Sequence, residues 1–197
     1  MQIPIFPLNG AVLYPETNLP LNIFEDRYID MVDFALSNKR LIGMIQTDEK
    51  GKLFKVGCIG KITSFNETKD GRYLINLEGM NLFLLKKEID MGFKFRIIEG
   101  NSIKHNSNNL SIDSNIKKTL LNKYSKYIKN KKIDLNISEL EKLTTKQLAK
   151  LIAMVSPFDH IDKQMLLEIS IPNEFCKKLL SILDIELVND GGGKTIN

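Results

Sequence analysis

The chain has 197 residues and a mass of 22.5 kDa, enough to bury a core as one large domain or two small ones. Hydrophobic residues make up 43% and charged residues 26% of the sequence, which is ordinary for a globular protein and argues against global disorder. The formal net charge of +4 is modest, and no apolar run approaches the roughly 18 residues that span a bilayer, so no membrane partner is expected.

The first half of the sequence reads mainly as β-structure. Short apolar segments end at proline, glycine or other turn residues, which is typical of strands. The predicted strands are Ile3–Phe6, Leu19–Leu21, Leu41–Gln46, Leu53–Phe65, Arg72–Glu78, Leu82–Leu85 and Phe93–Ile98. One early helix is predicted from Phe24 to about Ser37 by apolar residues at helical spacing. Because helices do not alternate with the strands, we expect a mostly antiparallel, partly closed barrel rather than a parallel α/β sheet.

Several local signals refine this first half. Asn22 with Glu25 three residues later predicts a capping box at the start of the early helix. Gly57 and Gly60 inside the long predicted strand indicate a bulge or a sharp bend. The dipeptide Asp70-Gly71 predicts a hairpin turn. The phenylalanines of this half are expected to lie in the core; they are Phe6, Phe54, Phe65, Phe83 and Phe93.

The second half switches to helical periodicity. The stretch from His105 to Ser114 is rich in Asn and Ser and predicts a linker. Capping boxes are expected at Ser138 with Glu141 and at Thr144 with Gln147, and Pro172 suits the first position of a helix. The expected boundaries are a barrel over residues 1–105, a linker over 106–114, a helical bundle over 115–190 and a flexible tail over 191–197.

The clearest charge feature is the segment Lys117–Lys132, which holds seven lysines and no acidic residue. Such a segment could bind an anionic partner such as nucleic acid or a membrane surface. Nucleic-acid sites usually add arginines and stacking aromatics, however, whereas this segment has no Arg, and its tyrosines Tyr124 and Tyr127 fall on the apolar stripe. A solvated helix face is therefore the preferred interpretation.

Catalytic and metal chemistry is poorly represented. Cys58 and Cys176 are the only cysteines, and His105 and His160 are the only histidines, so neither a zinc site nor a disulfide framework is expected. The acids around His160 suit a helix start better than an acid–base pair. The tail Gly193-Lys194-Thr195 lacks the upstream glycine and the following helix of a phosphate-binding loop. We therefore expect no catalytic residue, no metal and no cofactor.

The first residues lack a basic segment followed by a long apolar one, as a secretory signal requires. The expected location is the cytoplasm, where Cys58 and Cys176 would be reduced and buried among apolar neighbours.

Several segments, taken in order, resemble the substrate-binding (N-terminal) domain of Lon proteases. The opening Leu8–Pro15 and Leu19–Tyr28 carries the resemblance first. It continues through Leu41–Met44, Val56–Ile62, Asp70–Tyr73, Leu77–Gly79, Pro157–Phe158 and Lys163–Glu168, so that it covers about residues 3 to 188. One departure is Leu82 before Phe83, where the family commonly has an arginine.

This resemblance implies a PUA-like pseudobarrel with one early helix, followed by a C-terminal helical bundle, in the α+β class. It also implies a non-catalytic module that captures unfolded or tagged proteins, here as a stand-alone, single-domain bacterial member. The P-loop ATPase and the Ser–Lys protease domain of full-length Lon have no counterpart in the sequence. The implied partners are unfolded or exposed protein segments, and a full-length Lon protease or another protein.

A candidate peptide-binding surface follows from the early helix and the departure from the family pattern. Glu25, Asp26 and Arg27 could form a charged lip beside an apolar groove, or could serve only to cap the helix. The six candidate residues are Phe24, Glu25, Asp26, Arg27, Tyr28 and Leu82.

The leading functional hypothesis is a peptide-binding module that holds extended apolar segments in a shallow groove or along an exposed barrel edge. The alternative is an RNA-binding PUA-like protein that uses the basic helix Lys117–Lys132, with affinity that falls steeply with salt. A peptidase activity of the chain itself is the least favoured hypothesis.

Overall fold

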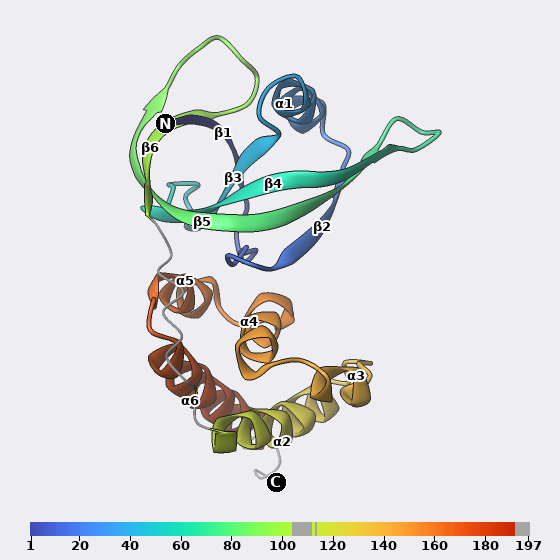
Figure 1. The fold of residues 1–197 in the computed structure, drawn as a ribbon, viewed down its shortest axis with the longest axis vertical. Helices are drawn as coiled ribbons and strands as arrows, with labels where there is room; N and C mark the ends of the chain where they lie inside the picture. Colours follow the sequence, from blue (N-terminus) through green and yellow to red (C-terminus); the bar gives the residue numbers. More distant parts are fainter. Residues whose placement is uncertain (104–111, 113, 192–197) are drawn as a thin grey trace, which may run out of the picture. The chain divides into compact units, whose positions relative to one another are not determined.

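The computed structural model of the protein describes residues 1–103, 112 and 114–191, which fall into two compact units. The first unit comprises residues 1–106 and 157–167, and the second comprises residues 107–156 and 168–197 (Figure 1). Of the predicted linker 106–114, only Ile112 and Ser114 lie within the described residues, and of the predicted tail 191–197 only Gly191 does.

The first unit is built on one sheet that closes on itself. Its strands are β1 (Gln2–Pro7), β2 (Asn18–Ile23), β3 (Leu41–Ile45), β4 (Val56–Glu67), β5 (Tyr73–Ile89) and β6 (Ile97–Ile103). They lie in the order β2-β5-β4-β3-β1-β6, and a further pairing of β5 with β6 closes the barrel (Figure 1). Only the β1–β3 pair is parallel among these strands, so the expected mostly antiparallel α+β architecture is confirmed.

The barrel core explains one of the strand glycines. Phe83 of β5 is fully buried at the centre of a cluster that includes Ile5 and Ile98. A Cβ atom on Gly57 of β4 would lie 2.6 Å from the Phe83 ring and 2.5 Å from the carbonyl oxygen of Met44. Glycine at this position therefore lets β4 approach the buried Phe83 ring closely. The predicted irregularity is also present, since the β4–β5 register shifts near Gly60.

Helix α1 (Asp26–Leu36) buries Tyr28, Met31, Val32 and Ala35, as its periodicity predicts. The predicted capping box is wrong. Glu25 is the N-cap and makes no side-chain capping bond, because its carboxylate instead accepts a hydrogen bond of 2.9 Å from Arg27. Asn22 lies within β2 and takes no part in the cap.

Two further expectations in this unit need correction. The predicted strands Arg72–Glu78 and Leu82–Leu85 form one long strand, β5, and the last strand begins at Ile97 rather than at Phe93. Phe65 and Phe93 are not core residues, because 42% and 44% of their surfaces are exposed. The reason is their position. Phe65 lies on β4 beyond its pairing with β3, and Phe93 lies in the connection between β5 and β6.

Helix α5 (His160–Glu168) packs in the first unit although it is distant in sequence from the barrel. Buried amides make the attachment. The Gln46 side chain donates to Gln164 at 3.0 Å and to the His160 carbonyl oxygen at 3.1 Å, and Gln164 donates to the Val56 carbonyl oxygen at 3.1 Å. The Lys163 ammonium donates to the Gly10 carbonyl oxygen at 2.8 Å, which ties the β1–β2 connection to the same helix.

The second unit contains α2 (Ser114–Asn130), α3 (Ile137–Glu141), α4 (Thr145–Val155) and α6 (Pro172–Gly191), with α2, α4 and α6 in mutual contact. The capping box of Thr144 with Gln147 and the helix start at Pro172 are confirmed. The capping box at Ser138 is wrong. Asn136 is the N-cap of α3, and its side chain accepts from the Ser138 backbone, so Ser138 lies inside the helix.

Candidate functional site

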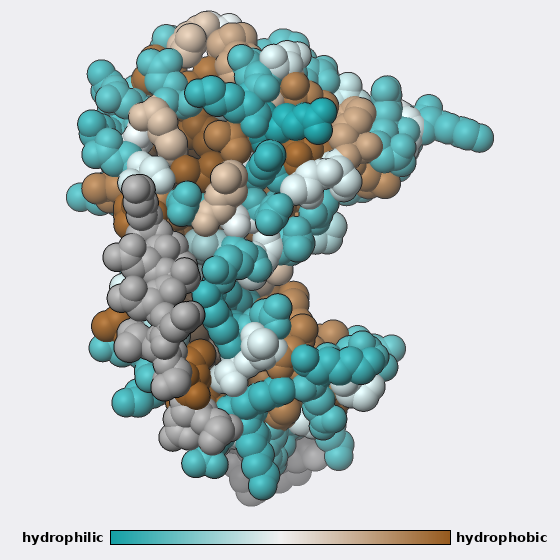
Figure 2. Space-filling model, in the orientation of Figure 1, coloured by the Kyte–Doolittle hydropathy of each residue, from teal (hydrophilic) through white to brown (hydrophobic). Residues whose placement is uncertain are grey.

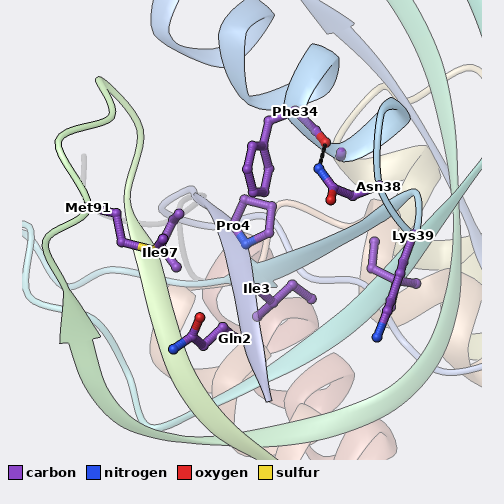
Figure 3. A pocket seen from close by; sticks show the side chains of 10 residues that line it. Gln2, Ile3, Pro4, Phe34, Asn38, Lys39, Met91 and Ile97 are labelled. Atoms are coloured by element: carbon purple, nitrogen blue, oxygen red, sulfur yellow. Dashed lines mark hydrogen bonds between the residues drawn. The ribbon is translucent and has the colours of Figure 1, made fainter.

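A cavity of about 210 Å³ opens in the first unit between the C-terminal end of α1 and strands β1 and β6 (Figure 3). Its apolar lining includes Pro4, Phe34, Leu41, Met91 and Ile97. Polar side chains come from Gln2, Asn38 and Lys39 at its edges. In Figure 3 the Phe34 ring lies over Pro4, and Met91 lies beside Ile97.

The cavity follows from the way β1 changes partners. Residues Gln2–Pro4 pair with β6, whereas Ile5–Pro7 pair with β3. Met1 and Ile5 both donate to carbonyl groups on the β6 side, so strand alternation turns the backbone of Gln2 and Pro4 toward the β3 side. Pro4 has no N–H with which to continue a ladder there. Strands β1 and β3 separate at this point, and α1 ends over the gap between them.

A cluster of aromatic rings adjoins the cavity through Phe34, which lines it. The ring centroids of Phe34 and Phe93 are 5.1 Å apart, those of Phe34 and Phe95 are 5.5 Å apart, and Phe93 stacks on Phe95 at 4.9 Å. Phe95 is buried, but Phe93 is 44% exposed and Met91 is 51% exposed. In Figure 2 apolar surface gathers over β1 and β6, between the β5–β6 connection and α1. An incoming apolar group can therefore reach both the ring cluster and the cavity.

Two ion pairs flank the connection between β5 and β6. Arg96 binds the Glu88 carboxylate through two hydrogen bonds of 2.8 and 2.6 Å, and this bonding lowers the pKa of the Glu88 carboxyl. Lys94 lies 3.1 Å from Asp30 of α1. The Lys94–Asp30 pair links the β5–β6 connection to α1, whereas the Arg96–Glu88 pair joins the two ends of the connection. The cavity therefore offers mainly apolar contacts, with two ion pairs nearby and Lys39 among its own lining residues.

Five of the six residues selected from the sequence come together at the opposite, N-terminal end of α1. Phe24 is 67% exposed, and Glu25 and Arg27 form an ion pair of 2.8 Å with Asp26 exposed between them. The Arg27 guanidinium lies 4.5 Å from the centre of the Tyr28 ring, and Tyr28 itself is buried.

The sixth residue, Leu82, lies apart from that group. It is buried in β5, between Cys58 of β4 and Ile103 of β6, where it packs as an apolar residue. None of the six residues lines the cavity. Their role in peptide binding remains a prediction.

Sequence reasoning missed Met91 and Phe93. The segment Asp90–Phe93 holds two large apolar residues around Gly92, whose φ of +74° marks a turn. Apolar residues on both sides of a turn glycine lie in a connection rather than a strand, and that signal could have identified them as exposed.

Three further features of the described part of the chain bear on its function: metal ligands, membrane-spanning helices and the basic helix α2. No group of three or more His, Cys, Asp or Glu residues there could hold a metal ion. None of the helices in the described ranges combines the length and apolar content needed to cross a bilayer. The basic helix α2 uses several lysines internally. Lys123 pairs with Asp184, Lys131 lies 3.2 Å from Glu186, and Lys117 donates to the Glu141 carbonyl oxygen.

A largely apolar cavity with a few polar side chains is typical of a binding site. The family model described as "ATP-dependent protease La (LON) substrate-binding domain" matches residues 2–184. The chain therefore belongs to the Lon substrate-binding domain family, as its sequence motifs predicted. The domain that defines this family is a non-catalytic module. The comparisons give no support to the RNA-binding alternative.

Among curated relatives, Lon protease of Buchnera aphidicola subsp. Acyrthosiphon pisum is 32% identical over 198 residues, covering 94% of this chain and 25% of the relative. Lon protease of Escherichia coli K12 is 27% identical over 201 residues, covering 95% of this chain and 25% of the relative. The chain thus spans about a quarter of the length of these relatives.

Two solved structures share the fold. The Lon N-terminal domain protein from Xanthomonas campestris has a TM-score of 0.68 at 19% identity, covering 92% of this chain and 98% of that one. The N-terminal domain of Mycobacterium avium complex Lon protease has a TM-score of 0.67 at 15% identity, covering 93% and 98%. The predicted PUA-like barrel with a helical C-terminal part agrees with these neighbours.

Proposed function

We propose that the chain captures unfolded polypeptides and that the cavity beside α1 receives their exposed apolar side chains. The observation that carries this proposal is a cavity of about 210 Å³ lined by the half-exposed Met91, together with the half-exposed Phe93, whose ring lies 5.1 Å from that of the lining residue Phe34. Ligand pockets for small molecules usually start at roughly 300 Å³. A cavity below that size suits a single side chain of a polypeptide better than a whole metabolite.

The energetics favour a weak contact that is used repeatedly. Burying one large apolar side chain contributes about 1.5–3 kcal/mol, which alone gives only a millimolar or weaker complex after the costs of association. An unfolded protein offers many such side chains along one chain, and their number raises the chance of rebinding. Folded proteins bury these side chains and would not compete.

The test is binding of fluorescently labelled β-casein, an unfolded protein, measured by fluorescence anisotropy. We expect Phe93→Ser to weaken binding about five- to thirtyfold, because the half-exposed ring loses its contact with the client. Met91→Gln should weaken it less. Binding should change little between low and high salt, because the contact is apolar.

A matched control is available in Met80→Gln. Met80 is 44% exposed, close to the 51% of Met91, but it does not line the cavity. This variant should bind casein like the unmodified protein. Equal binding by Phe93→Ser, Met91→Gln and Met80→Gln would refute the cavity as the capture site, and no binding of casein at all would refute the function.

We further propose that the chain breaks no covalent bonds itself and passes the polypeptides that it captures to a protein partner, such as a full-length Lon protease. The proposed place of action is the cytoplasm. The buried, free cysteines Cys58 and Cys176 are consistent with a reducing compartment. Co-purification of the tagged chain with a protease, followed by mass spectrometry, tests the partner.

A further inference from the structure

Strands β4 and β5 continue beyond the barrel as an arm, which projects clearly from the first unit in Figure 1. On one side of β4, β3 pairs only as far as Lys61, and no described strand pairs with residues Thr63–Glu67 on that side. All five of these residues are exposed. The arm therefore presents a free strand edge.

The register of the arm tells which backbone groups face outward. Thr68 donates to Arg72 across the hairpin, so strand alternation directs Asn66 toward β5 and the N–H and C=O groups of Phe65 and Glu67 away from it. The Ile62 N–H points to the same outer side, since it donates to Arg40 at the start of β3 at 2.8 Å. Two donors and two acceptors are thus aligned on the edge beyond the end of β3.

Two residues that commonly block an exposed edge, proline and lysine, are absent from Thr63–Glu67. The β4–β5 register shifts between Ile62 and Ser64, so the bulge lies at the root of the edge and leaves Phe65–Glu67 in regular register. The other outer strand of the arm, β2, carries an exposed Pro20 at its centre, which cannot donate to an added strand. The Phe65 ring, 42% exposed, packs edge-on against Tyr73 at 4.8 Å and offers an apolar contact beside the free edge.

Charges differ between the two ends of the edge. Arg40 lies at the root, is exposed and takes part in no ion pair with a described residue. Lys61 is also at the root, but Glu78 lies directly opposite it on β5. Glu67 stands at the outer end, near Tyr73. A strand laid along the edge therefore meets a positive charge at the root and a negative charge toward the tip.

We propose that the β4 edge, Thr63–Glu67, receives an extended segment of a client polypeptide as an added antiparallel strand, with its C-terminal end beside Arg40. The direction follows from β3, which lies antiparallel to β4 and begins at Leu41. A strand in line with β3 and running the same way ends at the root of the arm. Its terminal carboxylate, or an acidic side chain there, then meets the guanidinium. The proposal rests on the capture of unfolded polypeptides argued above.

Added-strand binding depends on backbone hydrogen bonds, so the probes are modified in the backbone. The parent probe is a fluorescein-labelled heptapeptide of alternating valine and serine with a free C-terminal carboxylate. Two companions are N-methylated at one or the other set of alternate amides, and a third has a C-terminal amide. We expect one N-methylated peptide to bind about tenfold more weakly than the parent and the other to bind within about twofold. The C-terminal amide should bind about two- to fivefold more weakly.

Amide hydrogen exchange of the unmodified protein locates the added strand. On addition of the parent peptide, exchange at Phe65 and Glu67 should slow. Exchange at Asn66, whose backbone faces β5, should not change. These measurements need no substitution, so they hold even if an arm variant fails to fold.

Substitutions separate backbone from side chain and assign the direction. Phe65→Pro removes the outward N–H and should abolish binding, whereas Phe65→Ala keeps it and should weaken binding only a few-fold. Arg40 has a φ of +60°, so Arg40→Gly removes the charge at a conformation that glycine adopts freely. It should abolish the preference for the free carboxylate. Lys69→Gln, at the tip of the same arm, is the matched control and should retain that preference.

Equal binding of both N-methylated peptides and the parent would overturn the proposal, and so would loss of the carboxylate preference in Lys69→Gln instead of Arg40→Gly. Such results would leave the capture function intact if Phe93→Ser still weakened casein binding. Conversely, if Phe93→Ser leaves casein binding unchanged, the cavity is refuted as the capture site, but the proposal for the strand edge still stands. The two failures are therefore distinguishable.

Discussion

The buried amide of Gln164 gives a stringent test of how α5 is attached to the barrel. Gln164 is 4% exposed and Gln46 is 1% exposed, and the two side chains are joined by a hydrogen bond of 3.0 Å. Gln164 also donates to the Val56 carbonyl oxygen at 3.1 Å. Replacing Gln164 by alanine removes these two bonds and leaves the carbonyl oxygen of the half-buried Val56 without this donor.

The expected loss follows from these contacts. A buried hydrogen bond contributes about 1 kcal/mol net, and an unsatisfied partner costs about 1–3 kcal/mol. Gln46 keeps its bond of 3.1 Å to the His160 carbonyl oxygen, so only part of that penalty applies. Gln164→Ala should therefore lower the free energy of unfolding by about 2–3 kcal/mol. Gln164→Glu should cost more at neutral pH, because it places a carboxylate against a carbonyl oxygen.

The pH dependence of the stability of Gln164→Glu provides a second test of how deeply this side chain is buried. Burial raises the pKa of the introduced carboxyl above its unfolded value, so the folded state binds the proton more tightly. Stability is then retained below the unfolded pKa and is lost as pH rises through the folded pKa. Acidification should bring this variant back toward the unmodified protein, since a protonated carboxyl can donate as the amide does.

The assay is urea unfolding followed by far-UV circular dichroism, together with hydrogen exchange of peptides that cover residues 157–168. Met165→Ala is the control, because Met165 lies on the same helix but is 39% exposed. This substitution should lower the free energy of unfolding by much less than Gln164→Ala does. A change below about 0.5 kcal/mol in Gln164→Ala, within the range of surface substitutions, would show that the amide network does not anchor α5.

Three other substitutions test the core, the second unit and the predicted site. Gly57→Ala should cost about 2 kcal/mol or more in urea unfolding, because the new Cβ meets the Phe83 ring at 2.6 Å and the Met44 carbonyl oxygen at 2.5 Å; an unchanged midpoint would show that both the ring and the backbone can shift. Burial raises the pKa of the Cys176 thiol from 9.0 to about 11, so the unfolded thiol ionises first and stability should fall by roughly 2 kcal/mol between those pH values. Cys176→Ala should remove this fall, and parallel pH profiles of the two proteins would contradict the assignment. Phe24→Ser should leave stability unchanged and weaken casein binding about two- to fivefold; equal binding would exclude the N-terminal end of α1 from the capture surface.

Much of the fold could be predicted from local signals because the barrel obeys them. Strand alternation, the turn at Asp70-Gly71 and the capping box at Thr144 all agree with the structure. The position of α5 could not be predicted in this way. Its attachment depends on Gln46 and Gln164, which are distant in sequence, and on polar side chains that periodicity assigns to a surface. Only the three-dimensional structure brings their amides together.

The binding surface was harder to predict for a related reason. Hydrophobic residues are assigned to the core by default, so Phe93 and Phe65 were assigned there too. The exposed fraction of a phenylalanine depends on whether another element covers it, and that is a tertiary property. The N-terminal end of α1, by contrast, is selected for its charges, of which Glu25 and Arg27 pair with each other and Arg27 also lies over the Tyr28 ring.

The exposure of Phe93 bears directly on whether it serves folding or binding. Its ring contacts Phe34 and Phe95, so truncation should cost some stability, but the 44% of its surface that meets solvent contributes nothing to the fold. If Phe93 served only in packing, its replacement would lower the free energy of unfolding and the free energy of casein binding by similar amounts. If Phe93→Ser weakens casein binding by much more than it lowers the free energy of unfolding, the exposed face of the ring is the part that contacts the client.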